Sequence, residues 1–252
     1  MKQMLMVLLL TLCAPWSRAL AVGATPLQLS LWSPVQAFPR DWDVMGLRCS
    51  GIYAQNNQVY GLDVGLFNSA AASSGGLQLG VGNVVSSLGF GFIIFDAADA
   101  PLLNMDVIGS THPYESYASY TGLQLSLLFN HADELRGLQF AGVGNRAVTL
   151  RGFQFALGAN DSFMGAGAQV GLSNEAHRGF SGVQLGGVNA CGGTLRGLQI
   201  GAANLCDGEL HGLQIGLINY AYAGGMTGVQ IGLLNFIWNN PVPFLPLINA
   251  HF

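Results

Sequence analysis

The sequence predicts an all-β protein, a repeat β-solenoid built from fifteen-residue coils. The first observation is a repeated word in which Gly is followed two positions later by Gln, as in GLQIGAAN and GLQIGLIN. These glycines recur every fifteen residues from Gly137 to Gly212, and Gly228 follows after sixteen. The second observation is that apolar residues alternate with Gln and small residues after each Gly, which is the period of a β-strand. A short fixed period is typical of one stacked unit.

An up-and-down outer-membrane β-barrel is the alternative fold, in which each unit would be one strand and one turn. The equal length of the units favours the solenoid, because such barrels alternate short turns with long loops. The apolar set of three residues is also short for a lipid-facing band about 25 Å tall. An N-terminal export signal and a terminal aromatic residue, Phe252, are usual in such barrels, so this alternative stays open.

Composition places the 252-residue chain among packed proteins. Half of the residues are hydrophobic and only 9% are charged. The chain therefore has apolar surface to bury and too little charge to remain solvated and disordered. The net charge of -4 offers no basic field, which excludes nucleic acid as a partner.

The N-terminus predicts a signal peptide over residues 1–21. Lys2 supplies a positive start, Met4 to Leu12 is an apolar run, and Ala19-Leu20-Ala21 is a small-x-small cleavage site. The run is shorter than the roughly 20 residues that span a bilayer, which argues against a membrane anchor. We therefore expect an exported chain that begins near Val22 and lies at the cell surface, in the outer membrane or in the periplasm.

The rest of the chain divides into three parts. Residues 22–45 form an N-terminal strand and cap, and residues 239–252 form a proline-rich C-terminal cap, since proline cannot donate to a further strand. Residues 46–238 are the fifteen-residue β-repeat array. An irregular excursion at 84–121 interrupts it, and we expect degenerate coils with a loop there. In three central units Asn falls one place later, at Asn130, Asn145 and Asn160, which predicts a bulge.

Within one coil, counted from Gly as position 1, we expect positions 2, 4 and 6 to face inward, as at Leu213, Ile215 and Leu217. The Gln at position 3 then faces outward or lies at an edge. It forms either an amide ladder, each side chain bonding to the next coil, or a strip that binds a glycan or peptidoglycan. Asn is expected at a corner, where it tolerates left-handed backbone.

The basic residues before the repeat Gly, Arg136, Arg151, Arg196 and His211, form either a solvated edge paired with acidic neighbours or a stripe that contacts anionic envelope polymers. Exposed pairs of this kind contribute little stability.

Two cysteines occupy the same position in neighbouring repeats. Cys191 and Cys206 stand fifteen residues apart, so stacked coils place them side by side, about 4.8 Å apart in backbone terms. That spacing is compatible with a disulfide, which an exported protein can form. The other interpretation is a pair of small buried side chains.

The tyrosine-rich part of the excursion is the candidate ligand contact, with Tyr114, Tyr117 and Tyr120 as its residues. Irregular loops on rigid scaffolds commonly carry function. The alternative is a loop folded over the edge of a coil.

No catalytic, cofactor-binding or metal-binding residues are predicted. The five histidines stand at unlike positions without ligand spacing, and the acidic residues are dispersed rather than clustered on one face. We therefore expect a protein that is not an enzyme and uses no cofactor. An outer-membrane barrel or pore and a solenoid enzyme acting on glycans are the alternative functions.

Three stretches of the sequence resemble a known family. They are the words GLQIGLIN and GVQIGLLN, the opening PLQLSLWSPVQ with GLRCSGIYAQNNQVYGLDVGLFN, and the closing PVPFLPLINAHF. The chain is similar to the short surface-repeat proteins of bacterial envelopes, the leptospiral-type surface-repeat family. The resemblance implies export, surface exposure and a structural or surface-interaction role, but no reaction. Envelope polysaccharide or a host surface are the candidate partners, and membrane association stays open.

Overall fold

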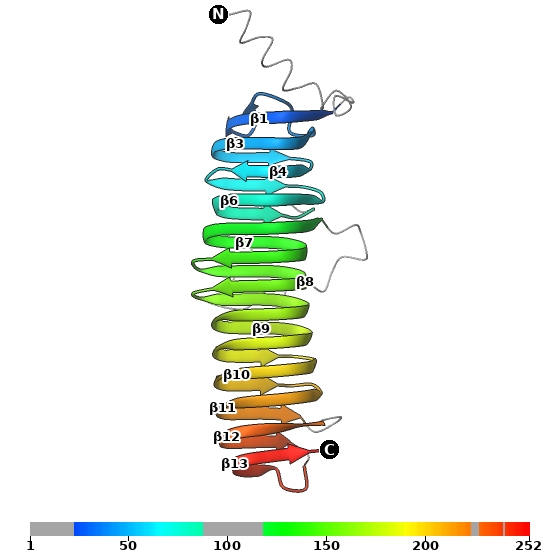
Figure 1. Cartoon of the computed structure of the whole chain (residues 1–252), viewed down its shortest axis with the longest axis vertical. Coiled ribbons are helices and arrows are strands. Elements are labelled where there is room, and N and C mark those ends of the chain that lie inside the picture. The colour runs from blue at the N-terminus through cyan, green and yellow to red at the C-terminus, as the bar shows by residue number, and fades with distance from the viewer. Residues whose placement is uncertain (1–22, 88–117, 223–226, 239) are drawn as a thin grey trace, which may run out of the picture.

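The computed structural model describes residues 23–87, 118–222, 227–238 and 240–252, and in this part of the chain every regular element is a strand. The strands form a single sheet that winds around a long axis (Figure 1). They are β1 (Ala24–Trp32), β2 (Val35–Gln36), β3 (Asp43–Asn56), β4 (Val59–Val64), β5 (Phe67–Ala70), β6 (Ser74–Val85), β7 (Ser119–Ala141), β8 (Gly144–Ala156), β9 (Ala159–Cys191), β10 (Thr194–Cys206), β11 (Leu210–Tyr222), β12 (Thr227–Trp238) and β13 (Phe244–His251).

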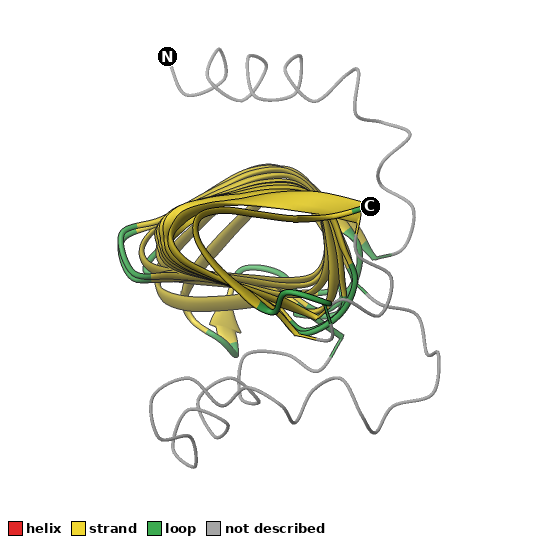
Figure 2. Ribbon diagram, turned by 90° about the horizontal axis from the view of Figure 1, so that it is seen from below, coloured by secondary structure: helices red, strands yellow, loops and turns green. Residues whose placement is uncertain are grey.

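Successive coils pair in parallel and in register. Leu198 lies beside Leu213, and Leu213 lies beside Val229. The chain therefore forms a β-solenoid of about twelve turns with about fifteen residues in each, and its cross-section is a flattened, closed outline (Figure 2). The predicted solenoid is confirmed. The up-and-down barrel is wrong for this chain, because it requires antiparallel neighbours.

The two ends of the sheet depart from the parallel pattern. At the N-terminal end β1 pairs with β3 in parallel and the short β2 turns back antiparallel on β1. At the C-terminal end β13 returns antiparallel on β12. The segments 22–45 and 239–252 thus supply the first and last strands of the sheet. Their role as caps stays a prediction.

No coil lies between the strands on either side of the irregular excursion. Strand β6 pairs directly with β7, so Gly76 lies beside Gly122 and Asn83 beside Asn130. The expectation of degenerate coils in this stretch is therefore wrong, because the parallel ladder passes straight across the break in sequence. Residues 88–117 lie outside the described part of the chain.

The late Asn of the central units is accommodated by a bulge. Gly80 pairs with Ser126 while Gly82 pairs with Phe129, so β7 carries one extra residue between these pairs. This confirms the predicted bulge. It returns Asn130 to the column of Asn83, so the asparagines stay aligned even though their spacing in sequence changes.

The predicted assignment of faces is wrong. The Gln and Asn columns are buried throughout the stack, whereas the apolar residues that alternate with Gln point outward, with exposed fractions such as 42% at Leu138, 38% at Ile200 and 56% at Leu217. A period of two reveals two alternating faces but not which one is inside. Burial of an amide is tolerated when its hydrogen bonds are made, and stacked amides make them with each other.

The apolar interior consists of two further columns. One column holds small residues such as Ala132, Ala147 and Cys206, and the other holds larger ones such as Leu135 and Leu195; all of them are buried in one cluster. Volume is conserved locally within the second column. Gly165 has no side chain, and the Phe180 ring of the next coil lies 2.8 Å from where a Cβ of Gly165 would stand. A large residue therefore fills the space that its neighbour leaves.

The repeat Gly is required by the backbone. At Gly197 φ is 138°, a conformation that residues with a side chain rarely adopt. A Cβ at this position would also overlap the carbonyl oxygen of Gly182 in the preceding coil. The same conformation and the same overlap recur from coil to coil, which explains why the period is marked by Gly.

We expect Gly197→Ala to destabilise the chain by roughly 1–3 kcal/mol from backbone strain, with a further cost from the overlap. Gly144→Ala is the matched control, because a Cβ there meets only Ala159 O at 3.2 Å and the neighbouring coils carry Phe129 and Ala159 at this position. Urea unfolding followed by circular dichroism measures both. Equal midpoints for the two variants would contradict the proposed backbone constraint.

Candidate functional site

The Gln column forms a continuous ladder of buried amides. From Gln124 onward, each Nε2 donates to the Oε1 of the Gln one coil nearer the N-terminus, at 2.7–2.9 Å, so Gln214 bonds to Gln199 and Gln199 to Gln184. The predicted amide ladder is confirmed, and the alternative of an exposed strip for a glycan is wrong because these side chains are buried. The members are Gln78, Gln124, Gln139, Gln154, Gln169, Gln184, Gln199, Gln214 and Gln230.

The Asn column forms a second ladder of the opposite polarity. Asn204 Nδ2 donates to Oδ1 of Asn219 in the following coil at 2.8 Å, and it also donates to the carbonyl of Ile215 at 2.9 Å. The donors of this ladder therefore point toward the C-terminus, whereas those of the Gln ladder point toward the N-terminus. The two rows of amide dipoles oppose each other, so the stack gains hydrogen bonds without accumulating a large net dipole.

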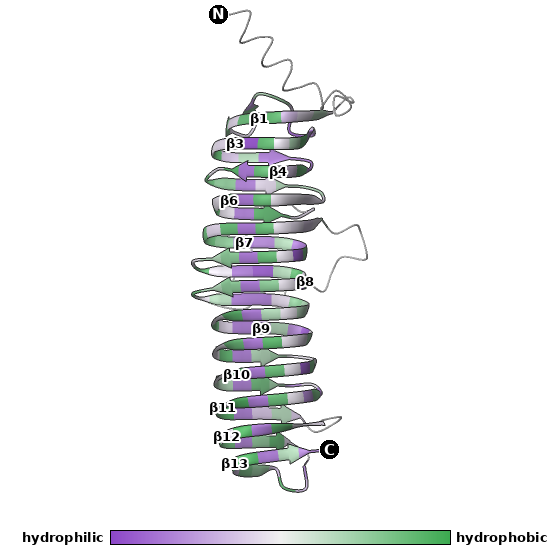
Figure 3. Cartoon of the chain, viewed as in Figure 1, coloured by the Kyte–Doolittle hydropathy of each residue, from purple (hydrophilic) through white to green (hydrophobic). Residues whose placement is uncertain are grey.

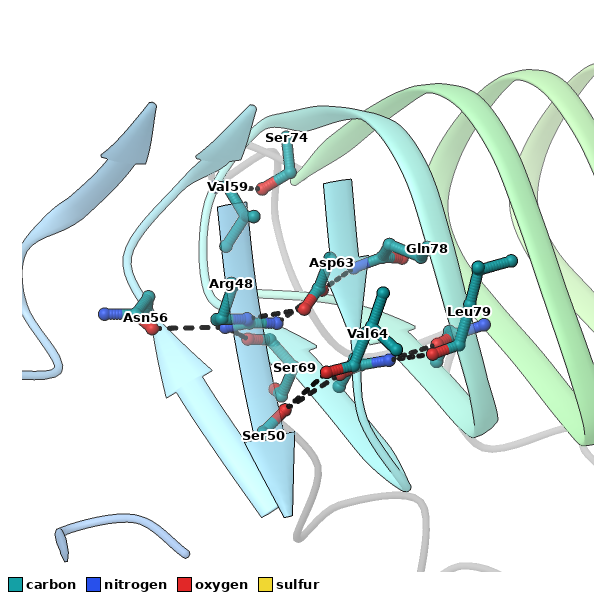
Figure 4. A network of polar contacts seen from close by, with 12 residues as sticks. Arg48, Ser50, Asn56, Val59, Asp63, Val64, Ser69, Ser74, Gln78 and Leu79 are labelled. Carbon is teal, nitrogen blue, oxygen red and sulfur yellow. Dashed lines mark hydrogen bonds and ion pairs between the residues drawn. The ribbon is translucent and has the colours of Figure 1, made fainter. Parts of the chain in front are cut away.

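A buried ion pair ends the Gln ladder at its N-terminal side (Figure 4). Asp63 stands at the Gln position and its Oδ2 accepts from Gln78 Nε2 at 3.0 Å. One coil earlier Arg48 donates to both Asp63 oxygens, at 2.7 and 2.6 Å, and to the carbonyl of Ser69 at 2.8 Å. A carboxylate only accepts, so it terminates a chain of donors. Sequence reasoning missed this pair, although GLR and GLD replace GLQ in these two repeats and signal it.

Asp133 joins the two ends of the excursion. Its Oδ2 accepts the backbone N–H of Ser87 at 3.0 Å and that of Ala118 at 3.2 Å. Burial opposes the charged form, but hydrogen bonds from His131 and the serines prevail and lower the pKa of Asp133. This carboxylate therefore fixes the positions at which the chain leaves and re-enters the stack. No motif in the sequence indicated it.

Of the predicted ligand-contact tyrosines, the structure describes Tyr120, and that side chain does not lie at the surface. Tyr120 is fully buried in the apolar column, and its hydroxyl donates to the carbonyl of Gly76 at 2.9 Å and lies 3.1 Å from that of Leu123. Burial, assisted by the nearby Asp63 charge, raises the pKa of this phenol. Tyr120 as a ligand contact is therefore wrong, because it occupies a core position of the first coil after the excursion. Tyr114 and Tyr117 lie outside the described residues.

Cys191 and Cys206 lie side by side, as their spacing predicted. They pair in register between β9 and β10, and both are buried free thiols. The hydrogen bond with Cys191 and burial raise the pKa of Cys206. The structure thus contains two small buried side chains, and the disulfide stays a prediction.

Charged side chains lie on the other outward sides of the coils. Glu134 pairs with Arg136 at 3.0 Å and with Arg151 of the next coil at 3.8 Å. His211 lies 3.4 Å from Glu209. These contacts support the predicted solvated edge, in which charges of both signs alternate along and between coils.

The outward residues at positions 2, 4 and 6 form what we call the apolar side. Positions 2 to 7 of the described coils hold only two charged residues, Arg48 and Asp63, and both are buried. The columns of the coils appear as bands of hydrophobic and hydrophilic residues that run down the stack (Figure 3). The strongly exposed members of the apolar side include Leu62, Leu66, Leu127, Leu138, Leu157, Leu172, Leu185, Ile200, Leu217, Ile231 and Leu233.

Comparison with protein-family models, with curated proteins and with solved structures gave no match. Among the described residues, no group of three or more His, Cys, Asp or Glu side chains is arranged to hold a metal ion. The same residues include no helix of the length and apolarity needed to cross a membrane. The resemblance to surface-repeat proteins therefore stays an expectation.

Two adjacent residues test which face is inside. Gln184→Leu removes the acceptor of Gln199 and the donor to Gln169, and each buried group left unpaired costs about 1–3 kcal/mol. The control, Leu185→Gln, places an amide on the apolar side and should change stability by less than about 1 kcal/mol. Thermal melting of the two variants should rank the first as the more damaging. The reverse order would contradict the assignment of faces.

The ion pair should be replaceable by two further ladder steps. Arg48→Met leaves Asp63 buried without its partner and should cost about 3–5 kcal/mol. The double variant Arg48→Gln/Asp63→Gln should recover most of that loss, because the new amide at position 63 could accept from Gln78 and donate to the new amide at position 48. Melting temperatures of the two variants measure the recovery. A double variant as unstable as Arg48→Met would show that the pair has a role other than ending the ladder.

Proposed function

We propose that the chain is an exported, non-enzymatic structural protein of the bacterial cell envelope that presents the apolar side as an interaction surface. The observation that carries the proposal is the extent of this side. It continues through the described coils without an exposed charge, although the other sides bear Arg, Asp, Glu and His. Soluble monomers rarely expose continuous apolar surface of this extent, which marks a site of interaction.

The interior supports a structural role. Each coil is held to the next by main-chain ladders and by one Gln and one Asn amide bond, as at Gln199 and Asn204. These bonds repeat along the axis, so bending the stack would stretch many of them together. A stiff rod that keeps a constant spacing between its ends, and that displays one side along its length, is the role this construction supports.

Export is the second part of the proposal and rests on the predicted signal peptide.

The polar partners considered from the sequence are less well supported by the geometry than an apolar one. The Gln column is buried and cannot contact an envelope polysaccharide. The charged sides carry paired groups of both signs rather than a basic stripe, as at Glu134 with Arg136 and Arg151.

Expression of the full chain in a Gram-negative host tests export. We expect the mature protein to begin near Val22 and to be found outside the cytoplasm, because residues 1–21 have the charge, apolar run and cleavage site of a signal peptide. N-terminal sequencing and cell fractionation measure both. Leu9→Arg/Leu10→Arg is the control, since it interrupts the apolar run and should retain the chain inside. A cytoplasmic wild-type chain that keeps Met1 would contradict the proposal.

A further inference from the structure

The apolar side is large enough for a stable protein interface. About twelve coils at a spacing of about 4.8 Å and five residues of strand at about 3.3 Å give a surface of roughly 1,000 Å². A stable complex of standard size buries about 800 Å² on each partner. Arg48 and Asp63, the charged residues at positions 2 to 7 of the described coils, are buried, so the apolar side exposes no charge. Two such surfaces can therefore meet without repulsion.

The period of the apolar side is matched by a second copy of the same chain. Leu198, Leu213 and Val229 belong to one in-register column, and every outward column repeats at the same inter-strand spacing. Two surfaces with the same period can interdigitate row by row over their whole length, as paired β-sheets do in dry interfaces. A lipid surface has no such period. Binding to anionic lipid is also unsupported, because positions 2 to 7 of the described coils carry no exposed Lys or Arg.

Aromatic side chains mark the middle of the apolar side. The ring centroid of Phe140 lies 5.6 Å from that of Phe153 and 6.1 Å from that of Phe155, and all three rings are on outward, partly exposed positions. Five coils precede the two that begin at Gly137 and Gly152, namely that of β1 and those beginning at Gly46, Gly61, Gly76 and Gly122. Five follow, beginning at Gly167, Gly182, Gly197, Gly212 and Gly228.

A central position is where a two-fold axis brings a residue against its own copy, and aromatic residues at interface centres carry much of the binding energy. We propose that two copies of this chain associate face to face through the apolar side in a symmetric dimer, with Phe140, Phe153 and Phe155 at its centre. This inference names the partner in the interaction role proposed above and rests on that role. The charged sides of both copies remain in water.

Substitution of Phe153 by charged residues of either sign tests the dimer. The exported full chain should sediment with twice the mass of one chain at micromolar concentration. Phe153→Glu and Phe153→Lys should each raise the dissociation constant about 100-fold or more, because like charges meet near the axis without water. An equimolar mixture of the two variants should recover the dimer, since opposite charges then face each other. Sedimentation velocity measures all three samples.

Met164 supplies the matched control. It is also a large apolar residue, 46% exposed, and it lies in register with Thr149, outside the apolar side. Met164→Glu and Met164→Lys should leave the dimer unchanged. Should a Phe153 variant fail to fold by circular dichroism, Leu138→Glu and Leu138→Lys replace the pair, because Leu138 is 42% exposed and adjoins Phe153 in the same column.

Three sedimentation results would overturn the inference: a monomeric wild-type chain, a mixture of the charged variants that stays monomeric, or equal dissociation by the Met164 variants. Flotation with phosphatidylcholine vesicles, lost in Phe153→Glu, would overturn it in favour of a lipid surface. The export measurement is independent of these, so a correctly exported monomer would refute the dimer and leave export standing. A cytoplasmic dimer would refute export and leave the dimer standing.

Discussion

The hydrogen bond between identical amides of neighbouring coils is the interaction on which this structure depends. A buried amide is costly when unpaired, and here the partner of each Gln or Asn is the same residue one turn away. Gln199 is satisfied by Gln184 and Gln214, and Asn204 by Asn189 and Asn219. The coils must therefore be parallel, in register and of equal effective length, and the bulge before Asn130 maintains that register. The regularity of the sequence follows from this requirement.

The same arrangement determines the surface. Once Gln occupies the inward position of an alternating strand, the residues on either side of it must face outward, and here those residues are Leu, Ile, Val and Phe. Stacking partly covers them, because each lies between similar residues above and below. The protein thus combines a polar ladder inside with apolar columns outside. These columns are fully shielded from water only when a partner binds them.

The sequence was sufficient to predict the solenoid, the coil length, the bulge and the amide ladder, because all of these are properties of a period. It was not sufficient to predict which face of the strand is buried, because alternation alone does not distinguish the two faces. Hydropathy misleads at these positions, since Ile215 has the character of a core residue and yet Gln214 is the buried one. Features that occur once were harder to anticipate. Arg48 and Asp63 could have been found, since they replace Gln at its own position. Asp133 and Tyr120 could not, because their roles come from the direct pairing of β6 with β7 across the excursion, and no local pattern encodes that contact.

The polarity of the Gln ladder gives it two unlike ends. Its N-terminal end is the acceptor Asp63, and at its C-terminal end the Oε1 of Gln230 is buried without a donor among the described residues. The two ends of the ladder are therefore unlike, whereas each coil between them presents the same donors and acceptors as its neighbouring coils. Duplication of one fifteen-residue unit within the array would lengthen the rod by about 4.8 Å and leave no amide unpaired. The length of this protein can thus change by whole coils during evolution, at little cost in stability and without altering either end.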